Sequence, residues 1–409
     1  MTIEELTGEK LGVCVSGGLD SRTVAKRCVE AGLETLCFTA DLGQPDEDDI
    51  GAVTEKMAPC GVKTVIVDLK REMAEACFAV LRSRGRYDGG YWNSTGIARA
   101  VTVRGLLTEM KKRGCTVLAH GATGRGNDQM RFERYTNVLA PDMKVYAPWR
   151  DPVLLKEFPG RKQMAEYLNS AGIETFAGDN ALYSTDANLA GISYEGENLE
   201  SLETPATIVE PRMGVWPANA PDKGEEVTIR LKQGRPVEIC GKEMNALDVM
   251  IKANEIAGRN GVGIRNVVEN RIIGTKSRGV YESPGMELLG FCVDCVYQAV
   301  MDRRAGELFA ALSALVGKQI YDGRFYDPAP RAALAAVDVL SRPASGTVKV
   351  RLYKGNIEFL SLTDCPGSLY NPADASMEES EGLNPESSRG YAEVQRVEAL
   401  ALARAGQIE

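Results

Sequence analysis

The first 150 residues alternate short apolar runs with stretches of helical periodicity. The apolar runs are four to six residues long and rich in β-branched side chains, which is typical of buried strands. Strands that alternate with helices at this spacing predict βαβ units and a parallel sheet. The strands are predicted over residues 11–15, 35–40, 62–67 and 116–119, and the helices over 22–30, 71–81 and 95–112.

The loops that follow three of these strands begin at Ser16, Ala40 and His120. Ligands of a parallel sheet bind beyond the carboxyl ends of its strands. We therefore expect these three loops to meet at one rim of a first domain that spans residues 1–170.

From about residue 171 the pattern changes to turn-rich stretches, hairpins and longer helices. Turn residues at 232–234 and 354–356 predict two hairpins. Helical periodicity covers residues 246–258 and one continuous stretch at 286–315. This mixture predicts an α+β second domain over residues 171–365. The hairpin strands are predicted at 226–231, 235–240, 347–352 and 357–362.

The last 44 residues, 366–409, are predicted to form a separate tail. Residues 366–389 are rich in Pro, Ser, Glu and Asn, which is typical of an extended arm. Residues 391–405 then predict a helix with an apolar stripe that includes Val394 and Val397. Because a helix at the end of an arm cannot bury such a stripe alone, we expect a partner chain to cover it.

Composition narrows the possible functions. The 409 residues carry a formal net charge of −9, with 48 Lys and Arg against 57 Asp and Glu, which argues against nucleic acid as a partner. The single histidine, His120, excludes metal sites built from several histidines. There is no apolar stretch of membrane-spanning length and no secretory leader, so we expect a cytoplasmic protein with no membrane partner.

Ten cysteines are present, and one pair, Cys292 and Cys295, has the C-x-x-C spacing of redox and metal sites. No second such pair exists, and no histidine lies near it in the sequence. We therefore interpret both as small core residues of a helix, with a redox or metal role as the alternative.

The sequence Ser-Gly-Gly-Leu-Asp-Ser at residues 16–21 lies between a predicted strand and a predicted helix. Two glycines allow the backbone to approach an anion closely, and the helix that follows directs its first amides at the same point. The spacing fits neither the Walker nor the dinucleotide-binding pattern. It matches the pyrophosphate loop of the N-type ATP pyrophosphatases, and the alternative is a tight turn that merely favours glycine.

A second motif, at residues 119–133, places three glycines and then Asn127, Asp128 and Arg131 after a predicted strand. Glycine backbone suits contact with a nucleotide. Asp128 suits an ammonium group, and the planar guanidinium of Arg131 suits a carboxylate. The motif therefore predicts a site for an amino acid, and the alternative is a polar surface loop.

These motifs together resemble the argininosuccinate synthase family, from about residue 11 to residue 369. Further similar segments occur in the family's order and spacing at residues 39–44, 147–150, 183–189, 268–271 and 276–285, and residues 91–101 are closer to a divergent bacterial branch. The resemblance implies an α/β fold. A parallel-sheet nucleotide-binding domain, adenine nucleotide α-hydrolase-like, would precede an α+β synthetase domain and a C-terminal oligomerisation helix.

The resemblance also implies roles for individual residues. Catalytic roles would fall to Asp20, Arg99 and Asp128. ATP would be bound by Cys14, Val15, Ser16, Gly17, Gly18, Leu19, Asp20, Ser21, Arg22, Ala40, His120, Gly121, Gly124, Arg125 and Gly126. Aspartate would be bound by Thr123, Asn127 and Asp128. Citrulline would be bound by Tyr91, Thr95, Asn127, Arg131, Ser184, Ser193, Glu195, Glu269 and Tyr281.

The implied reaction uses ATP with Mg²⁺, citrulline and aspartate, in a homotetramer. A ureido carbon is a poor electrophile, so its oxygen would first attack the α-phosphorus of ATP and expel pyrophosphate. The aspartate amine would then displace AMP. No metal ligands are assigned and no general base is assigned, and we expect His120 to be structural because it ends a buried strand.

Three departures from the family pattern leave the amino-acid substrate open: Gly96, Arg125 and Asn266. One alternative is a related ligase acting on another ureido compound or amine. A tRNA-modifying pyrophosphate-loop enzyme and a non-catalytic nucleotide-binding regulator are further alternatives. The acidic composition argues against the tRNA enzyme, and the intact loop at 16–21 argues against the regulator.

Overall fold

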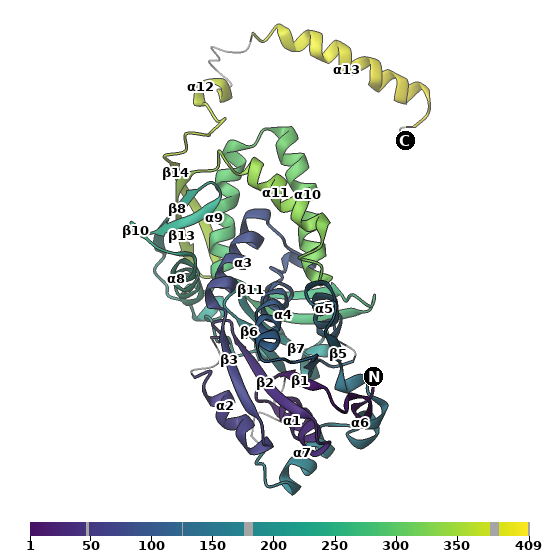
Figure 1. The fold of residues 1–409 in the computed structure, drawn as a ribbon. Coiled ribbons are helices and arrows are strands. Elements are labelled where there is room, and N and C mark those ends of the chain that lie inside the picture. Colours follow the sequence, from purple (N-terminus) through teal and green to yellow (C-terminus); the bar gives the residue numbers. More distant parts are fainter. Residues whose placement is uncertain (46–48, 125, 176–182, 377–383, 408–409) are drawn as a thin grey trace.

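A computed structural model describes residues 1–45, 49–124, 126–175, 183–376 and 384–407 (Figure 1). The N-terminal half is built on a parallel sheet with strand order β3-β2-β1-β4-β5. These strands are β1 (Lys10–Cys14), β2 (Glu34–Asp41), β3 (Lys63–Asp68), β4 (Val117–His120) and β5 (Lys144–Tyr146). The helices that connect and flank them are α1 (Leu19–Glu30), α2 (Ala52–Met57), α3 (Lys70–Ser83), α4 (Ser94–Lys112), α5 (Asp128–Leu139), α6 (Pro152–Glu157) and α7 (Arg161–Ser170).

The register of the parallel sheet brings three strand ends together. Cys14 at the end of β1 lies opposite Phe38 of β2 on one side and His120 of β4 on the other. Since all of these strands run the same way, the loops after β1, β2 and β4 leave from the same edge. The predicted parallel sheet and the predicted meeting of these three loops are both confirmed.

The C-terminal half contains two antiparallel sheets, which confirms the predicted α+β character. The first has the order β10-β9-β8-β13-β14 and includes both predicted hairpins. The second, in the order β11-β12-β7-β6, was not predicted as strands. The strands are β6 (Ser184–Asn188), β7 (Gly191–Glu195), β8 (Glu225–Lys232), β9 (Arg235–Ile239), β10 (Lys242–Glu243), β11 (Ile264–Asn270), β12 (Lys276–Glu282), β13 (Gly346–Tyr353) and β14 (Asn356–Thr363).

The helices of this half are α8 (Ala246–Arg259), α9 (Pro284–Val300), α10 (Arg303–Tyr321) and α11 (Pro328–Leu340). The prediction of one continuous helix over 286–315 is therefore wrong. Met301 and Asp302 have extended backbone, and the Asp302 carboxylate accepts hydrogen bonds from the amides of Arg304 and Ala305. A new helix starts there because the cap satisfies its first amides, whereas the apolar stripe continues on both sides and conceals the break.

The tail consists of the short α12 (Pro372–Ala375) and the helix α13 (Ser387–Arg404). The helix begins four residues before the predicted start at residue 391. Residues 387–390 of its first turn carry no apolar side chain, so the apolar periodicity could not predict them as helical. None of its residues is buried, and Figure 1 shows α13 extending beyond the body of the molecule.

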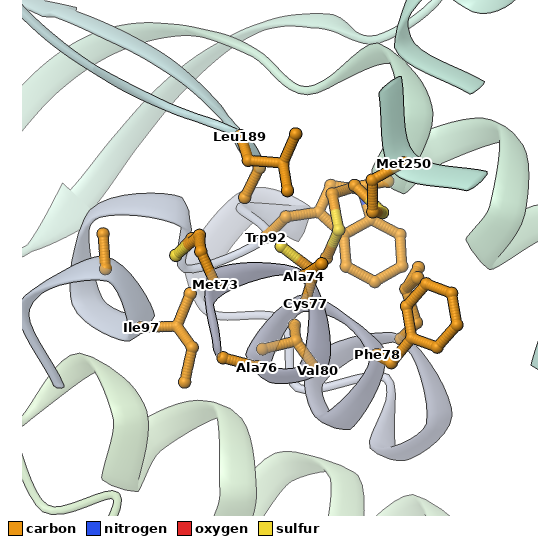
Figure 2. Close-up of a cluster of buried hydrophobic side chains, with 14 of the residues drawn as sticks. Met73, Ala74, Ala76, Cys77, Phe78, Val80, Trp92, Ile97, Leu189 and Met250 are labelled. Atoms are coloured by element: carbon orange, nitrogen blue, oxygen red, sulfur yellow. The ribbon is translucent and has the colours of Figure 1, made fainter. Parts of the chain in front are cut away.

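One large hydrophobic core joins the two halves of the molecule. Helix α3 of the N-terminal half packs against α8 and α9 of the C-terminal half. Figure 2 shows Met73 and Cys77 of α3 beside Trp92, Leu189 and Met250, which come from segments far apart in the sequence. The junction between the two halves is therefore held by continuous packing.

The C-x-x-C pair lies on α9. Cys292 is a member of the core and Cys295 packs against it, and both are free thiols. Burial raises the pKa of Cys295 to about 11, and it also raises the pKa of Cys292. Within the described ranges, no group of His, Cys, Asp and Glu side chains is arranged to hold a metal ion. The interpretation of both cysteines as core residues is confirmed.

Candidate functional site

The loop at residues 15–18 connects β1 to α1 and fits an anion. Gly17 has a φ of +77°, a left-handed conformation that glycine adopts without strain. Gly18 is the N-cap of α1 and has no side chain with which to cap the helix. The Ser21 hydroxyl accepts a hydrogen bond from the Ser16 amide at 3.1 Å, which fixes the turn. Backbone amides at the start of a helix are the feature that binds phosphate groups at other helix N-termini.

Neighbouring residues hold this loop in place. The Thr39 hydroxyl donates to the Val15 carbonyl at 2.9 Å and ties the end of β2 to the end of β1. Arg22 is almost fully buried, and its guanidinium donates to the Glu174 carbonyl at 2.6 Å. Ala40 lies at the end of β2, where its carbonyl accepts a hydrogen bond from the Gln44 side chain at 2.9 Å.

His120 ends β4 and is fully buried. Its Nδ1 accepts a hydrogen bond from the Ala122 amide at 3.3 Å, and its ring stacks on Phe132 with the centroids 5.1 Å apart. Burial lowers the pKa of His120 to about 4. The imidazole is therefore neutral at physiological pH, which supports the expected structural role.

Asp128, the first residue of α5, is held between two arginines. Its carboxylate accepts from Arg99 Nε at 2.8 Å and from Arg131 Nη1 at 2.9 Å. Arg99 also pairs with Asp186 at 2.9 Å, so four alternating charges form a chain across the site. Burial alone would raise the pKa of Asp128, but the two guanidinium groups outweigh it and lower that pKa. Asp128 is consequently a fixed anion and a weak proton acceptor.

Asn127 links the N-terminal half to the C-terminal half. Its side-chain oxygen accepts from the Ile272 amide at 3.0 Å, and its side-chain nitrogen donates to the Tyr321 hydroxyl at 2.9 Å. Arg131 makes a similar link, because its Nε donates to the Tyr321 carbonyl at 3.0 Å.

A wall of tyrosines lines the side that comes from β12 and the start of α4. The rings of Tyr91 and Tyr281 lie 4.2 Å apart between centroids. The Tyr91 hydroxyl accepts from the Thr95 amide at 2.9 Å. Ser193 on β7 lies opposite Tyr281 on β12 and is buried.

Two carboxylates complete this wall, the half-buried Glu195 and the buried Glu269. Burial, with the nearby charge of Glu269, raises the pKa of Glu195 to about 7. Burial also raises the pKa of Glu269, although the hydrogen bond that the Tyr321 hydroxyl donates to Oε1 opposes the rise. Glu269 Oε2 is buried and has no hydrogen-bond partner among the described residues. A substrate ammonium or ureido N–H group would satisfy this oxygen and lower the cost of its burial.

The structure brings most of the predicted site residues together. Cys14 at the end of β1 lies opposite His120 at the end of β4, so the nucleotide loop and the amino-acid residues begin side by side. Burial raises the pKa of the Cys14 thiol, and the charge of Arg99 lowers that pKa by less. Ser184 and Ser193 lie in strands β6 and β7. Ser184 is exposed at the edge opposite Glu195. Arg125 lies outside the described residues.

Three residues of the site were not predicted from the sequence: Tyr87, Asp186 and Tyr321. Asp186 lies inside the segment 183–189 that resembles the family, so its charge could have been noticed. Tyr321 comes from the end of α10, about 190 residues from Asn127, and no motif marks it.

The departures at 96 and 266 have structural explanations in the packing of the chain. A Cβ at Gly96 would stand 3.1 Å from the Ile320 carbonyl oxygen, so glycine permits close packing of α4 against α10. The Asn266 side chain accepts from Arg278 Nε at 2.7 Å.

Comparison with known proteins agrees with this arrangement. Residues 10–174 match the model of the arginosuccinate synthase N-terminal HUP domain, and residues 183–402 match that of the arginosuccinate synthase C-terminal domain. The chain belongs to the argininosuccinate synthase family. It is 40% identical over 383 residues to the argininosuccinate synthase of Rhodopirellula baltica, covering 93% of this chain and 94% of that protein.

Family membership confirms the resemblance drawn from the motifs and identifies the chain as an enzyme of this kind. The HUP match spans all five strands of the parallel sheet, and the C-terminal match spans both antiparallel sheets. The described helices include none that combines the length and the apolar character needed to cross a bilayer.

Proposed function

We propose that this chain ligates citrulline and aspartate to argininosuccinate, with ATP cleaved to AMP and pyrophosphate, in arginine biosynthesis. One observation carries the proposal. A helix N-terminus with a glycine at its N-cap follows β1, and the charged cluster around Asp128 follows the adjacent strand β4. An anion site and an amino-acid site at one sheet edge suit a reaction that transfers an adenylyl group to an amino-acid substrate.

The electronics of citrulline explain why activation by ATP is needed. In the first step the ureido oxygen attacks the α-phosphorus, and the bond to pyrophosphate breaks. In the second step the aspartate amine adds to the ureido carbon, and the C–O bond to AMP breaks. Much of the rate enhancement would come from holding three substrates in line in one cleft. Amides of the loop after β1 would stabilise charge on the departing pyrophosphate.

We assign the substrates as the resemblance implies. The loop residues 14–22, Ala40 and the glycines after β4 would bind ATP. Arg131 would bind the citrulline carboxylate, with Glu269 and Glu195 on its ammonium or ureido N–H groups. Thr123, Asn127 and Asp128 would bind aspartate. The ionised carboxylate of Asp128, paired with two arginines and of lowered pKa, supports a binding role more than a proton-accepting one.

Mg²⁺ is part of the proposal because it neutralises ATP phosphates. This ion keeps several waters and is bound in such sites through substrate phosphates and one or two carboxylates. Asp20, in the first turn of α1 directly after the loop glycines, is the carboxylate that fits this requirement. When bound, Mg²⁺ would supply charge stabilisation at the phosphates.

Three further features belong to the proposal. The chain would act in the cytoplasm as a homotetramer. The exposed apolar stripe of α13 supports the tetramer because a stripe of this length is costly to leave in water. The division into residues 1–170, 171–365 and 366–409 is proposed with it.

The decisive experiment measures pyrophosphate and AMP release with ATP, Mg²⁺, citrulline and aspartate, omitting each in turn. We expect pyrophosphate release to require citrulline, and AMP with argininosuccinate to require aspartate as well. Release without citrulline would contradict the proposal. Faster release with another ureido compound, such as an N-carbamoyl amine of different chain length, would favour the related ligase instead.

A further inference from the structure

Tyr321 occupies the junction of the two halves. It is the last residue of α10 and is almost fully buried. Two glycines allow this helix end to approach the site. Gly96 of α4 leaves room for the Ile320 carbonyl, and a Cβ at Gly323 would stand 3.1 Å from the Arg131 Cα. The helix end is thus fitted closely between α4 and α5.

The Tyr321 hydroxyl joins two residues of the proposed citrulline site. It donates a hydrogen bond to Glu269 Oε1 at 2.5 Å and accepts one from Asn127 Nδ2 at 2.9 Å. The Tyr321 hydroxyl therefore occupies Oε1 of Glu269, while the other oxygen, Oε2, has no partner among the described residues.

The ring and the backbone of Tyr321 orient two further groups. The Arg131 guanidinium lies 5.0 Å from the ring centroid, and its Nε donates to the Tyr321 carbonyl at 3.0 Å. The Tyr321 ring also stacks on the ring of Tyr87, with the centroids 3.7 Å apart and the planes 16° from parallel. One residue therefore contacts Asn127, Arg131 and Glu269 at once.

We propose that Tyr321 is a positioning residue for the ureido amino acid, which aligns Glu269, Asn127 and Arg131 for its ammonium and carboxylate groups. This inference rests on the proposed function of the site. Tyr321 fixes which oxygen of Glu269 faces the substrate and the plane in which Arg131 presents its guanidinium. Preorganisation of this kind lowers the ordering cost of binding.

The test compares Tyr321→Phe with Tyr326→Phe. The first variant keeps the ring against Tyr87 and Arg131 and removes only the hydroxyl. The second is a matched control, because the Tyr326 hydroxyl donates to the Ala100 carbonyl at 2.9 Å and, within the described ranges, to none of the proposed substrate-binding side chains. We expect kcat/KM for citrulline to fall about 10- to 100-fold in Tyr321→Phe, as for a lost hydrogen bond to a charged group. KM for ATP should stay unchanged in both variants.

The pH profile gives a second measurement that a merely structural tyrosine would not affect. The Tyr321 hydrogen bond stabilises the ionised form of Glu269, so its loss raises the pKa of Glu269 further. The acidic limb of kcat/KM for citrulline should then move to higher pH by roughly one unit in Tyr321→Phe. The other titratable and charged groups that face Glu269 are Tyr87, Asp88, Tyr91, Arg131, Glu195 and Tyr281. These are retained in both variants, so the comparison isolates the hydroxyl.

Each outcome bears on one proposal. An unchanged kcat/KM for citrulline in Tyr321→Phe would overturn the positioning role of Tyr321. Equal falls in kcat/KM for citrulline and for ATP would overturn it as well. If wild-type enzyme showed no citrulline-dependent pyrophosphate release, the proposed function itself would fail. A citrulline-specific loss with a shifted acidic limb would support the positioning role.

Discussion

At the scale of residues, the site depends on charges that compensate one another. Asp186, Arg99, Asp128 and Arg131 alternate in sign through contacts of 2.8 to 2.9 Å. Arg131 is buried and the other three are partly buried, so removing one charge weakens the pairing of its neighbours where water compensates little. The motif alone could predict that Asp128 and Arg131 are charged groups suited to an amino-acid ligand. The pairing of Asp128 with Arg99 could not be predicted, because Arg99 reaches it from another helix, α4.

Asp128→Asn keeps the shape of the side chain and removes its charge. We expect KM for aspartate to rise at least about tenfold, because the amine loses its anionic partner and Arg131 loses its counter-ion, whereas Arg99 keeps Asp186. KM for ATP should change little, since the loop after β1 is untouched. Initial rates with each substrate varied in turn measure both. Weakened ATP binding with an unchanged aspartate KM would contradict the assignment.

His120 gives a pH prediction for stability. Its pKa is about 4 in the folded chain and about 6.5 when unfolded. As the pH falls, the unfolded state therefore binds a proton before the folded state does. The stability that the neutral, buried imidazole contributes is intact above pH 6.5 and is lost as the pH falls towards 4. The shift corresponds to about 3 kcal/mol. Urea denaturation should show that wild type loses about this much more unfolding free energy between pH 6.5 and 4 than His120→Gln does. Equal losses would mean that His120 is not buried as a neutral group.

At the scale of elements, periodicity predicted those whose apolar residues face a single core. Strands β1 to β4 and the hairpin of β13 and β14 were found in this way. The hairpins β6–β7 and β11–β12 were not, because they carry site residues such as Ser193 and Glu269 where alternating apolar residues would be expected. The break between α9 and α10 was missed because a single cap, Asp302, produces it.

The two ends of α1 offer a matched pair of glycines. Gly17 before the helix and Gly32 after it have φ values of +77° and +74°. Alanine at either position costs roughly 1–2 kcal/mol of stability through left-handed strain. Only Gly17→Ala should also raise KM for ATP, by about tenfold or more, because it displaces the anion-binding amides. Equal KM values for ATP in the two variants would exclude the loop as the phosphate site.

At the scale of the whole molecule, the site exists only because the two halves share a core. Helix α3 packs on α8 and α9, and this contact fixes the distance between the nucleotide loop and the wall of Tyr281 and Glu269. Local sequence patterns do not encode such long-range contacts. The motifs could therefore predict the chemistry of the site, while the contribution of Tyr321 from α10 required the folded chain.

The tail provides the last prediction. Val394 and Val397 of α13 are 68% and 69% exposed in the single chain, and the helix extends beyond the body of the molecule (Figure 1). If a second copy covers this stripe in the proposed tetramer, Val394→Glu with Val397→Glu would place charges in an apolar interface and dissociate it. Arg396→Glu changes the net charge by the same −2 on the opposite face and should leave the assembly intact. Light scattering after size exclusion measures the mass of each variant. An unchanged mass in the double variant would show that α13 does not hold the assembly together.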